Sequence, residues 1–220
     1  MATKVVLLGD SMVDTYDFMG SGFPELKREL VKLDPSSYIE LKNHGVGTTD
    51  VALGLQRTSV SYDYLARGRK LPAVIDESPD LVILESFAYN HWTDSPDDIN
   101  KYVACHRNII RTIKEKTSAK ILLLSTIAPN KKKFATGVLS LNWTEQKRVK
   151  EYELVIKYFC EFNQFASQSG LPFLNLFDQS LTSQTGKLAY ISNVDYVHLS
   201  YSGRTFISRL LAPEILKLIQ

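Results

Sequence analysis

The sequence has little of the features that define several large classes of protein. Only 2 of its 220 residues are cysteine, so it cannot be built on a disulfide scaffold. Its 26 Lys and Arg nearly balance 24 Asp and Glu, and the net charge of +2 does not indicate a dedicated binder of nucleic acid. No apolar run reaches the roughly 20 residues of a membrane span, and the N-terminus has no signal-peptide core. We therefore expect a globular, cytoplasmic protein with no stable membrane insertion and no nucleic-acid partner.

Signatures of the common cofactor sites are also missing. Gly45-Val46-Gly47 begins like a dinucleotide-binding loop, but Asp50 stands where the third glycine belongs. The 4 histidines and 2 cysteines show no spacing typical of metal ligands. We therefore expect neither a cofactor nor a metal. Cys105 and Cys160 both fall in helical patterns, and we expect two buried, reduced thiols.

What the sequence does contain is an alternation of short apolar runs with longer helical patterns. The predicted strands are residues 4–8, 38–42, 80–85, 120–125 and 172–177. The predicted helices are residues 24–33, 71–77, 96–116, 144–168 and 202–219. The third and fourth strands are almost continuously apolar, which is typical of strands covered on both faces. The pattern predicts a single three-layer α/β/α domain over residues 1–220, with a parallel sheet and right-handed crossovers.

The fourth predicted helix carries an aromatic stripe at helical spacing. Its members are Tyr152, Val155, Phe159, Phe162 and Ala166. Such a stripe is far more often a core face than a ligand site, so we interpret it as core.

Small and hydrogen-bonding residues follow the first three predicted strands. They are Gly9-Asp10-Ser11, the segment 43–48 and Asn90, and Asp195 and His198 precede the last helix. Ligands of open parallel sheets bind at the carboxyl ends of the strands. We therefore expect these residues to meet at one edge of the sheet.

These residue types include the parts of a nucleophilic site. A serine hydroxyl needs a nearby base, a group that orients this base, and donors for the developing oxyanion. Ser11 fits the nucleophile, His198 the base and Asp195 the group that orients the base. Asn90 fits a donor for the oxyanion. Each has a plainer interpretation: Ser11 as a helix N-cap, Asp195 and His198 as a surface turn, and Asn90 as a turn residue. Gly45 and Gly47 fit either close backbone approach to a ligand or a turn with positive φ.

Taken together, the blocks resemble the SGNH (GDSL-type) hydrolases. The matching residues, in the family's order, are Gly9-Asp10-Ser11, Asn43-x-Gly45-x-Gly47, Asn90 and Asp195-x-x-His198. The resemblance spans nearly the whole chain. It implies a flavodoxin-like five-stranded parallel sheet between helices. It also implies hydrolysis of esters of lipids, carbohydrates or small molecules, without a metal or cofactor.

The resemblance assigns a role to each residue of the site. Ser11 would be the nucleophile that forms an acyl-enzyme, His198 the general base and then acid, and Asp195 its orienting partner. The Ser11 N–H, the Gly47 N–H and the Asn90 side chain would form the oxyanion hole.

Two departures from the family pattern concern this oxyanion hole. The third block usually reads Gly-x-Asn-Asp, but here it reads Ala88-Tyr89-Asn90-His91, so the support around Asn90 must differ. The second block is one residue short, so either Gly47 or Thr48 presents the N–H, and we favour Gly47. The predicted substrate-contacting loops are residues 57–70 and 127–143. Tyr62, Tyr64 and Trp92 are candidates to line the cleft.

Two other functions remain open at this stage. An acyltransferase would use the same triad in a cleft that admits an alcohol and excludes water. A catalytically silent binding module would explain the altered third block, although it has no need of a complete triad. The acyl group, the alcohol and the oligomeric state are not specified by these patterns.

Overall fold

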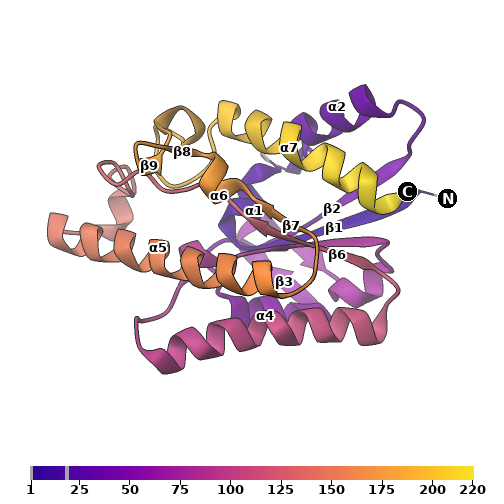
Figure 1. Ribbon diagram of the computed structural model, residues 1–220, viewed down its shortest axis with the longest axis horizontal. Helices are drawn as coiled ribbons and strands as arrows, with labels where there is room; N and C mark the ends of the chain where they lie inside the picture. Colours follow the sequence, from indigo (N-terminus) through magenta and orange to yellow (C-terminus); the bar gives the residue numbers. More distant parts are fainter. Residues whose placement is uncertain (1, 18–19) are drawn as a thin grey trace.

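The computed structural model describes residues 2–17 and 20–220 and is built around a five-stranded parallel sheet (Figure 1). The strand order is β2-β1-β5-β6-β7. The bounds are β1 Thr3–Gly9, β2 Ile39–Gly45, β5 Leu81–Glu85, β6 Lys120–Ser125 and β7 Phe173–Asn175. The predicted three-layer α/β/α fold is confirmed, and each of the five predicted strands has a counterpart in this sheet.

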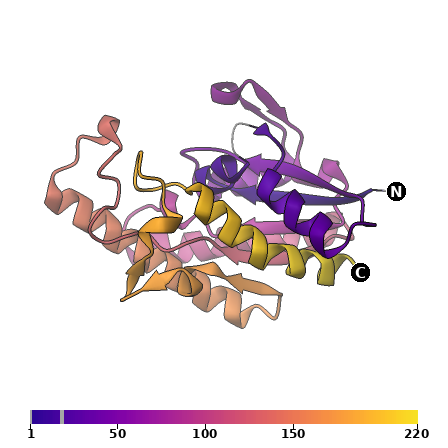
Figure 2. The ribbon, with the colours of Figure 1, turned by 90° about the horizontal axis from the view of Figure 1, so that it is seen from above.

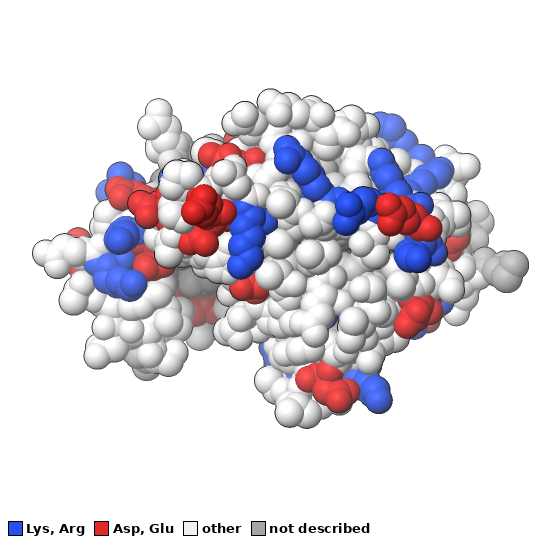
Figure 3. Space-filling view, turned by 90° about the horizontal axis from the view of Figure 1, so that it is seen from below, with Lys and Arg blue, Asp and Glu red and all other residues white. Residues whose placement is uncertain are grey.

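Helices cover both faces of the sheet (Figure 1). On one face, α2 (Pro24–Leu33) packs against α7 (Tyr201–Ile219). The other face is covered by α3 (Val51–Ser59), α4 (Pro96–Lys116) and α5 (Glu145–Gln168). Basic and acidic side chains are interspersed on the face seen from below in Figure 3, without a field of one sign. Among the described residues, no helix combines the length and the apolar character that crossing a membrane requires.

The two-sided burial explains why the central strands are continuously apolar. Side chains of a strand alternate between the two faces of a sheet. In β1, Val6 and Leu8 join the core beneath α4 and α5, whereas Val5 and Leu7 join the core beneath α2 and α7. All four side chains are fully buried, so each position must be apolar.

The predicted helix at 71–77 is wrong in its first half. Leu71 ends the strand β4 (Arg69–Leu71), and only Val74–Glu77 forms a short 3₁₀ helix. Pro72 accounts for the difference, because proline disfavours helical backbone in the residue before it and lacks an N–H donor. The last predicted strand is also shorter, since the Asn175 side chain caps the short helix α6 (Leu176–Gln179).

Several elements have no counterpart among the predicted helices and strands. They include the helices α1 (Ser11–Tyr16) and α3, the antiparallel hairpin of β3 (Tyr62–Tyr64) and β4, and the small hairpin of β8 (Leu181–Thr182) and β9 (Thr185–Gly186). A 3₁₀ turn, Leu65–Arg67, joins β3 to β4, and this hairpin projects from the body of the molecule (Figure 2). The hairpins contain too few residues to show a strand period.

The expectation of two buried thiols is half wrong. Cys105 is buried, but Cys160 is exposed. The aromatic stripe of α5 does face the core, as predicted, and Phe159 is fully buried within it. Successive helical residues are turned by roughly 100°, so Cys160, next to Phe159, points to solvent.

A buried histidine makes the stability of the core depend on pH. His106 lies on the inner face of α4, where burial lowers the pKa of its imidazole to about 4. Its Nδ1 lies 3.0 Å from the carbonyl oxygen of Tyr102, one turn earlier. An unfolded histidine has a pKa of about 6.5, so the unfolded chain takes up this proton at a higher pH than the folded chain.

We therefore expect the free energy of unfolding to fall between about pH 6.5 and about pH 4. The contribution of His106 is complete above the unfolded pKa and is lost as the pH falls through the folded pKa, by about 3 kcal/mol in total. In His106→Leu this component should vanish. Urea titrations of both proteins at the two ends of this range measure it, and equal pH dependence in the two would contradict the assignment.

Candidate active site

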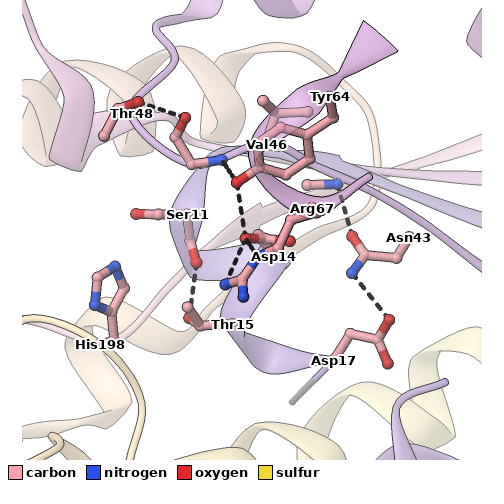
Figure 4. A network of polar contacts seen from close by, with 12 residues as sticks. Ser11, Asp14, Thr15, Asp17, Asn43, Val46, Thr48, Tyr64, Arg67 and His198 are labelled. Carbon is pink, nitrogen blue, oxygen red and sulfur yellow. Dashed lines mark hydrogen bonds and ion pairs between the residues drawn. The ribbon is translucent and has the colours of Figure 1, made fainter. Parts of the chain in front are cut away.

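The carboxyl ends of three neighbouring strands meet at one cavity of about 530 Å³. Ser11 follows β1, Gly47 and Thr48 follow β2, and Asn90 follows β5. All of them line the cavity, together with His198 from the segment before α7. Figure 4 shows Ser11 and His198 together in the view of this site, and both side chains belong to the cavity lining. The structure therefore brings together Ser11 and His198, which lie 187 positions apart in the sequence.

Ser11 is the first residue of the helix α1 (Ser11–Tyr16), but it does not cap this helix. The cap is Asp10, whose Oδ1 accepts a hydrogen bond of 2.7 Å from the Met12 N–H. The plainer interpretation of Ser11 as an N-cap is therefore wrong. Within the described residues the Ser11 hydroxyl makes no hydrogen bond, so it remains free to react with a ligand in the cavity.

Asp195 holds the His198 ring in one orientation. His198 Nδ1 lies 2.7 Å from Asp195 Oδ2. Asp195 Oδ1 accepts from the N–H groups of Val197 and His198, at 2.8 and 3.0 Å. Burial acts to raise the pKa of Asp195, but these hydrogen bonds outweigh it and lower the pKa to about 2. Asp195 is therefore a carboxylate at neutral pH, which favours the proton of a neutral His198 on Nδ1 and leaves Nε2 as the acceptor.

The Asn90 side chain is held by Asp10. Asn90 Nδ2 donates to Asp10 Oδ2 at 2.7 Å, while Asp10 Oδ1 caps α1. Asp10 is fully buried, which raises its pKa, and the bonds from Met12 and Asn90 oppose this rise. One carboxylate thus positions both the helix that carries Ser11 and the amide opposite it. The sequence prediction assigned Asp10 no role, although its place in the first block was the available signal.

The turn that leads into the altered third block, residues 88–91, is held by a buried carboxyl group. Phe87, just before Ala88, has a left-handed backbone with φ of 54°, and its N–H donates to Glu85 Oε2 at 2.9 Å. Glu85 is fully buried, and burial followed by the charge of Asp10 raises its pKa well above the ordinary value. The buried Glu85 carboxyl therefore fixes the turn just before Ala88, the residue that stands at the family's glycine position.

His91, which replaces the family's acid after Asn90, lines the wall of the cavity. Its Nε2 lies 3.4 Å from Glu151 Oε2, and its Nδ1 lies 3.0 Å from the carbonyl oxygen of Trp92. In place of the family's acid, this protein thus has an imidazole ring that packs against α5.

Gly47 and Thr48 differ in what their N–H groups bind. The Gly47 N–H donates to the Tyr64 hydroxyl at 3.0 Å, and this hydroxyl donates to Asp14 Oδ2 at 3.1 Å (Figure 4). A Cβ atom at Gly47 would lie 2.9 Å from the Tyr64 oxygen, so a larger residue there would displace the Tyr64 hydroxyl. Thr48 has a left-handed φ of 58°, and its N–H has no partner within the described residues. The N–H favoured by the sequence prediction, that of Gly47, is therefore occupied, and the alternative is free.

Gly45 serves packing instead of ligand binding. A Cβ atom there would lie 2.2 Å from the backbone nitrogen of Asp14, so glycine lets α1 approach the end of β2. Neither Gly45 nor Gly47 has a positive φ, which corrects the plainer interpretation of both as turn residues.

Both predicted loops reach the cavity. Tyr64 and Arg67 line it from the β3–β4 hairpin, and Phe134 and Trp143 line it from the segment 127–143. Tyr62 and Trp92 do not contribute to the lining. Among the described residues, no group of three or more His, Cys, Asp or Glu side chains is placed to hold a metal ion.

The fold has counterparts among solved structures. No protein-family model matches the sequence, and no curated protein matches it significantly. The acetyl xylan esterase AlAXEase superposes with a TM-score of 0.68 at 16% identity, over 96% of this chain and 99% of that chain. A GDSL-like lipase from Bacteroides thetaiotaomicron gives 0.65 at 14% identity, over 98% and 88%. A catalytic mutant of an acetylxylan esterase from Geobacillus stearothermophilus gives 0.62 at 17% identity, over 100% and 95%. The chain therefore has the fold of the SGNH (GDSL-type) hydrolases, as its sequence blocks predict.

Proposed function

We propose that this protein is a serine ester hydrolase in which Ser11 is the nucleophile, His198 the base and Asp195 the residue that orients it. The observation that carries the proposal is the Asp195–His198 hydrogen bond, together with the cavity that His198 and Ser11 both line. A carboxylate on Nδ1 and a serine beside the ring are what proton transfer from serine to Nε2 requires. Esters of small molecules, lipids or carbohydrates are the substrate class, in keeping with the structural neighbours.

The proposed reaction has two steps, acylation of Ser11 and hydrolysis of the acyl-enzyme. Ser11 Oγ attacks the ester carbonyl while His198 Nε2 takes its proton, and the C–O bond to the alcohol then breaks as His198 gives that proton to the departing oxygen. Water next loses a proton to His198 and attacks the acyl-enzyme. Collapse returns the proton to Ser11 and releases the carboxylic acid.

Three donors are available for the oxyanion of each tetrahedral intermediate. Among the residues that the structure describes, Asn90 keeps one amide N–H free, because only the other donates to Asp10. The N–H groups of Ser11 and Thr48 have no partner within the described residues. We assign the backbone part of the oxyanion hole to Ser11 and Thr48, since Tyr64 occupies the N–H of Gly47.

Asn90→Ala should lower kcat by about 10²- to 10³-fold and leave KM little changed, because an oxyanion donor acts mainly in the transition state. Steady-state hydrolysis of p-nitrophenyl acetate and butyrate measures this effect. A loss smaller than about tenfold would exclude Asn90 from the oxyanion hole.

Labelling with a fluorophosphonate tests the proposed function directly. The reagent phosphorylates an activated serine, so mass spectrometry should locate one adduct on Ser11, and Ser11→Ala should not be labelled. A folded protein that resists labelling would favour the silent binding module. Product analysis with an added alcohol separates a hydrolase from an acyltransferase, because a transferase yields a new ester in place of the acid.

A further inference from the structure

The cavity has two chemically different halves, and the strand order places them on opposite sides of Ser11. The β3–β4 hairpin lies against the end of β2, because Tyr64 binds Gly47 and Arg69 Nη2 donates to Gly45 O at 2.8 Å. Phe134 and Trp143 belong to the segment that follows β6. Since β1 and β5 lie between β2 and β6, Ser11 and Asn90 separate the hairpin from the aromatic side chains.

The half formed by the hairpin carries two guanidinium groups on one carboxylate. Arg67 Nε donates to Asp14 Oδ2 at 3.2 Å, and Arg69 Nη2 donates to Asp14 Oδ1 at 2.9 Å. Tyr64 adds a third, uncharged donor to Asp14. The Asp14 carboxylate balances one of the two positive charges, so this group of residues has a surplus of one positive charge.

This surplus charge borders open space. The Arg67 side chain is 49% exposed, although Asp14 beside it is only 6% exposed. Asp14 and Arg67 line both the catalytic cavity and an adjoining hollow of about 220 Å³, to which Arg69 and Asn43 also contribute. Asp17, which accepts hydrogen bonds from Asn43 and from the Phe23 N–H, lines neither space.

The opposite half is mainly apolar, although His91 and Glu151, whose side chains lie 3.4 Å apart, also line the cavity. Phe134 is only 4% exposed and is packed near Trp143 and Tyr152. Val138 and Leu141 extend this lining. An acyl group stays on the enzyme after the alcohol has left, so it suits the apolar side chains around the buried Phe134. The alcohol must depart, which suits the exposed side chain of Arg67.

We infer that the preferred substrate is an ester whose alcohol part carries an anionic group, a carboxylate or a phosphate, bound by Arg67 with Arg69, while an apolar acyl group packs against Phe134 and Trp143. The inference rests on the proposed function. Guanidinium groups bind both kinds of anion through paired N–H donors, and Arg67 has donors left beyond those bound to Asp14.

The test compares three esters of butyric acid. Two carry the anion on the leaving group, 4-butyryloxybenzoate and 4-butyryloxyphenyl phosphate, and the third, 4-butyryloxybenzamide, is neutral. Wild-type kcat/KM should be about tenfold higher for at least one anionic ester, mainly through a lower KM, and the preference should shrink at high salt because screening weakens an exposed charge pair. The anionic ester with the larger preference identifies the group.

Variants of Arg67 identify the residue responsible. In Arg67→Gln the preference should fall by about tenfold, to near equality of the anionic and neutral esters, and Arg67→Lys should restore part of it. Arg111→Gln, which removes an exposed arginine of α4, should keep the wild-type preference. Circular dichroism of each variant shows whether it is folded.

Two outcomes would overturn the inference. One is equal or higher kcat/KM for the neutral ester in the wild type. The other is a preference that Arg67→Gln leaves unchanged in a folded protein. Failure to hydrolyse any ester, with no labelling of Ser11, would instead contradict the proposed function.

Discussion

Replacing Ser11 with alanine is expected to lower kcat for ester hydrolysis by about 10⁵-fold or more. The substitution removes the proposed nucleophile, and in serine hydrolases loss of the nucleophile costs about as much as loss of the whole triad. The fold should survive, because Asp10 and not Ser11 caps α1. The binding of a substrate analogue should survive as well, since the other lining residues remain.

Single-turnover kinetics with p-nitrophenyl butyrate measures this effect, because the burst of product reports acylation separately from deacylation. Ser167→Ala, which changes an exposed serine of α5, is the matched control and should retain wild-type rates. An Ser11→Ala protein that keeps more than about a hundredth of the wild-type rate would require a different nucleophile.

Replacing Asp195 with asparagine is expected to lower kcat by about 10⁴-fold. Asparagine keeps an oxygen for the N–H groups of Val197 and His198, so the turn is preserved. Its amide can donate to His198 Nδ1, which places the imidazole proton on Nε2, where it cannot accept the proton of Ser11. The negative charge that stabilises the imidazolium is also lost.

The pH dependence gives this prediction a second readout. The pKa of Asp195 is about 2, below its ordinary value, so the stability that its ionisation contributes is complete above about pH 4 and is lost only as the pH falls through 2. Acidification from pH 7 to pH 4 therefore leaves Asp195 ionised in the wild type, so titration of Asp195 should not contribute to any change of kcat between these two pH values.

Asp97→Asn, at an exposed acid of α4, is the control variant and should change neither kcat nor its pH profile. Nearly wild-type kcat in Asp195→Asn would exclude Asp195 from orienting His198.

The sheet could be predicted because its signal is local. Val82 and Ile83 face opposite cores, so a run of consecutive apolar residues indicates that both faces of the strand are buried. Long amphipathic helices such as α4 and α5 show their period in the same way. The hairpin that carries Tyr64 and Arg67 has strands of three residues each, which is too short for any period to be recognised.

The candidate site was predictable as a set of residues but not as a network. Strand ends identified Ser11 and Asn90, because the position of a ligand site follows from the parallel sheet itself. The bond from Asn90 to Asp10 joins residues 80 positions apart, and the bond from Gly47 to Tyr64 depends on how a hairpin folds back. Such contacts arise from packing, so no spacing in the sequence distinguishes Gly47 from Thr48.

The two oxygens of Asp10 constrain any attempt to transfer this site to another protein. One oxygen fixes the start of α1 and the other fixes Asn90. Asparagine has a single acceptor oxygen, and its amide nitrogen cannot accept the Asn90 N–H in place of the second oxygen. Glutamate is longer by one methylene and does not fit the same buried space. A designer who grafts Ser11, His198 and Asn90 onto a new scaffold without this aspartate would thus lose the single group that fixes the positions of the serine and the amide relative to each other.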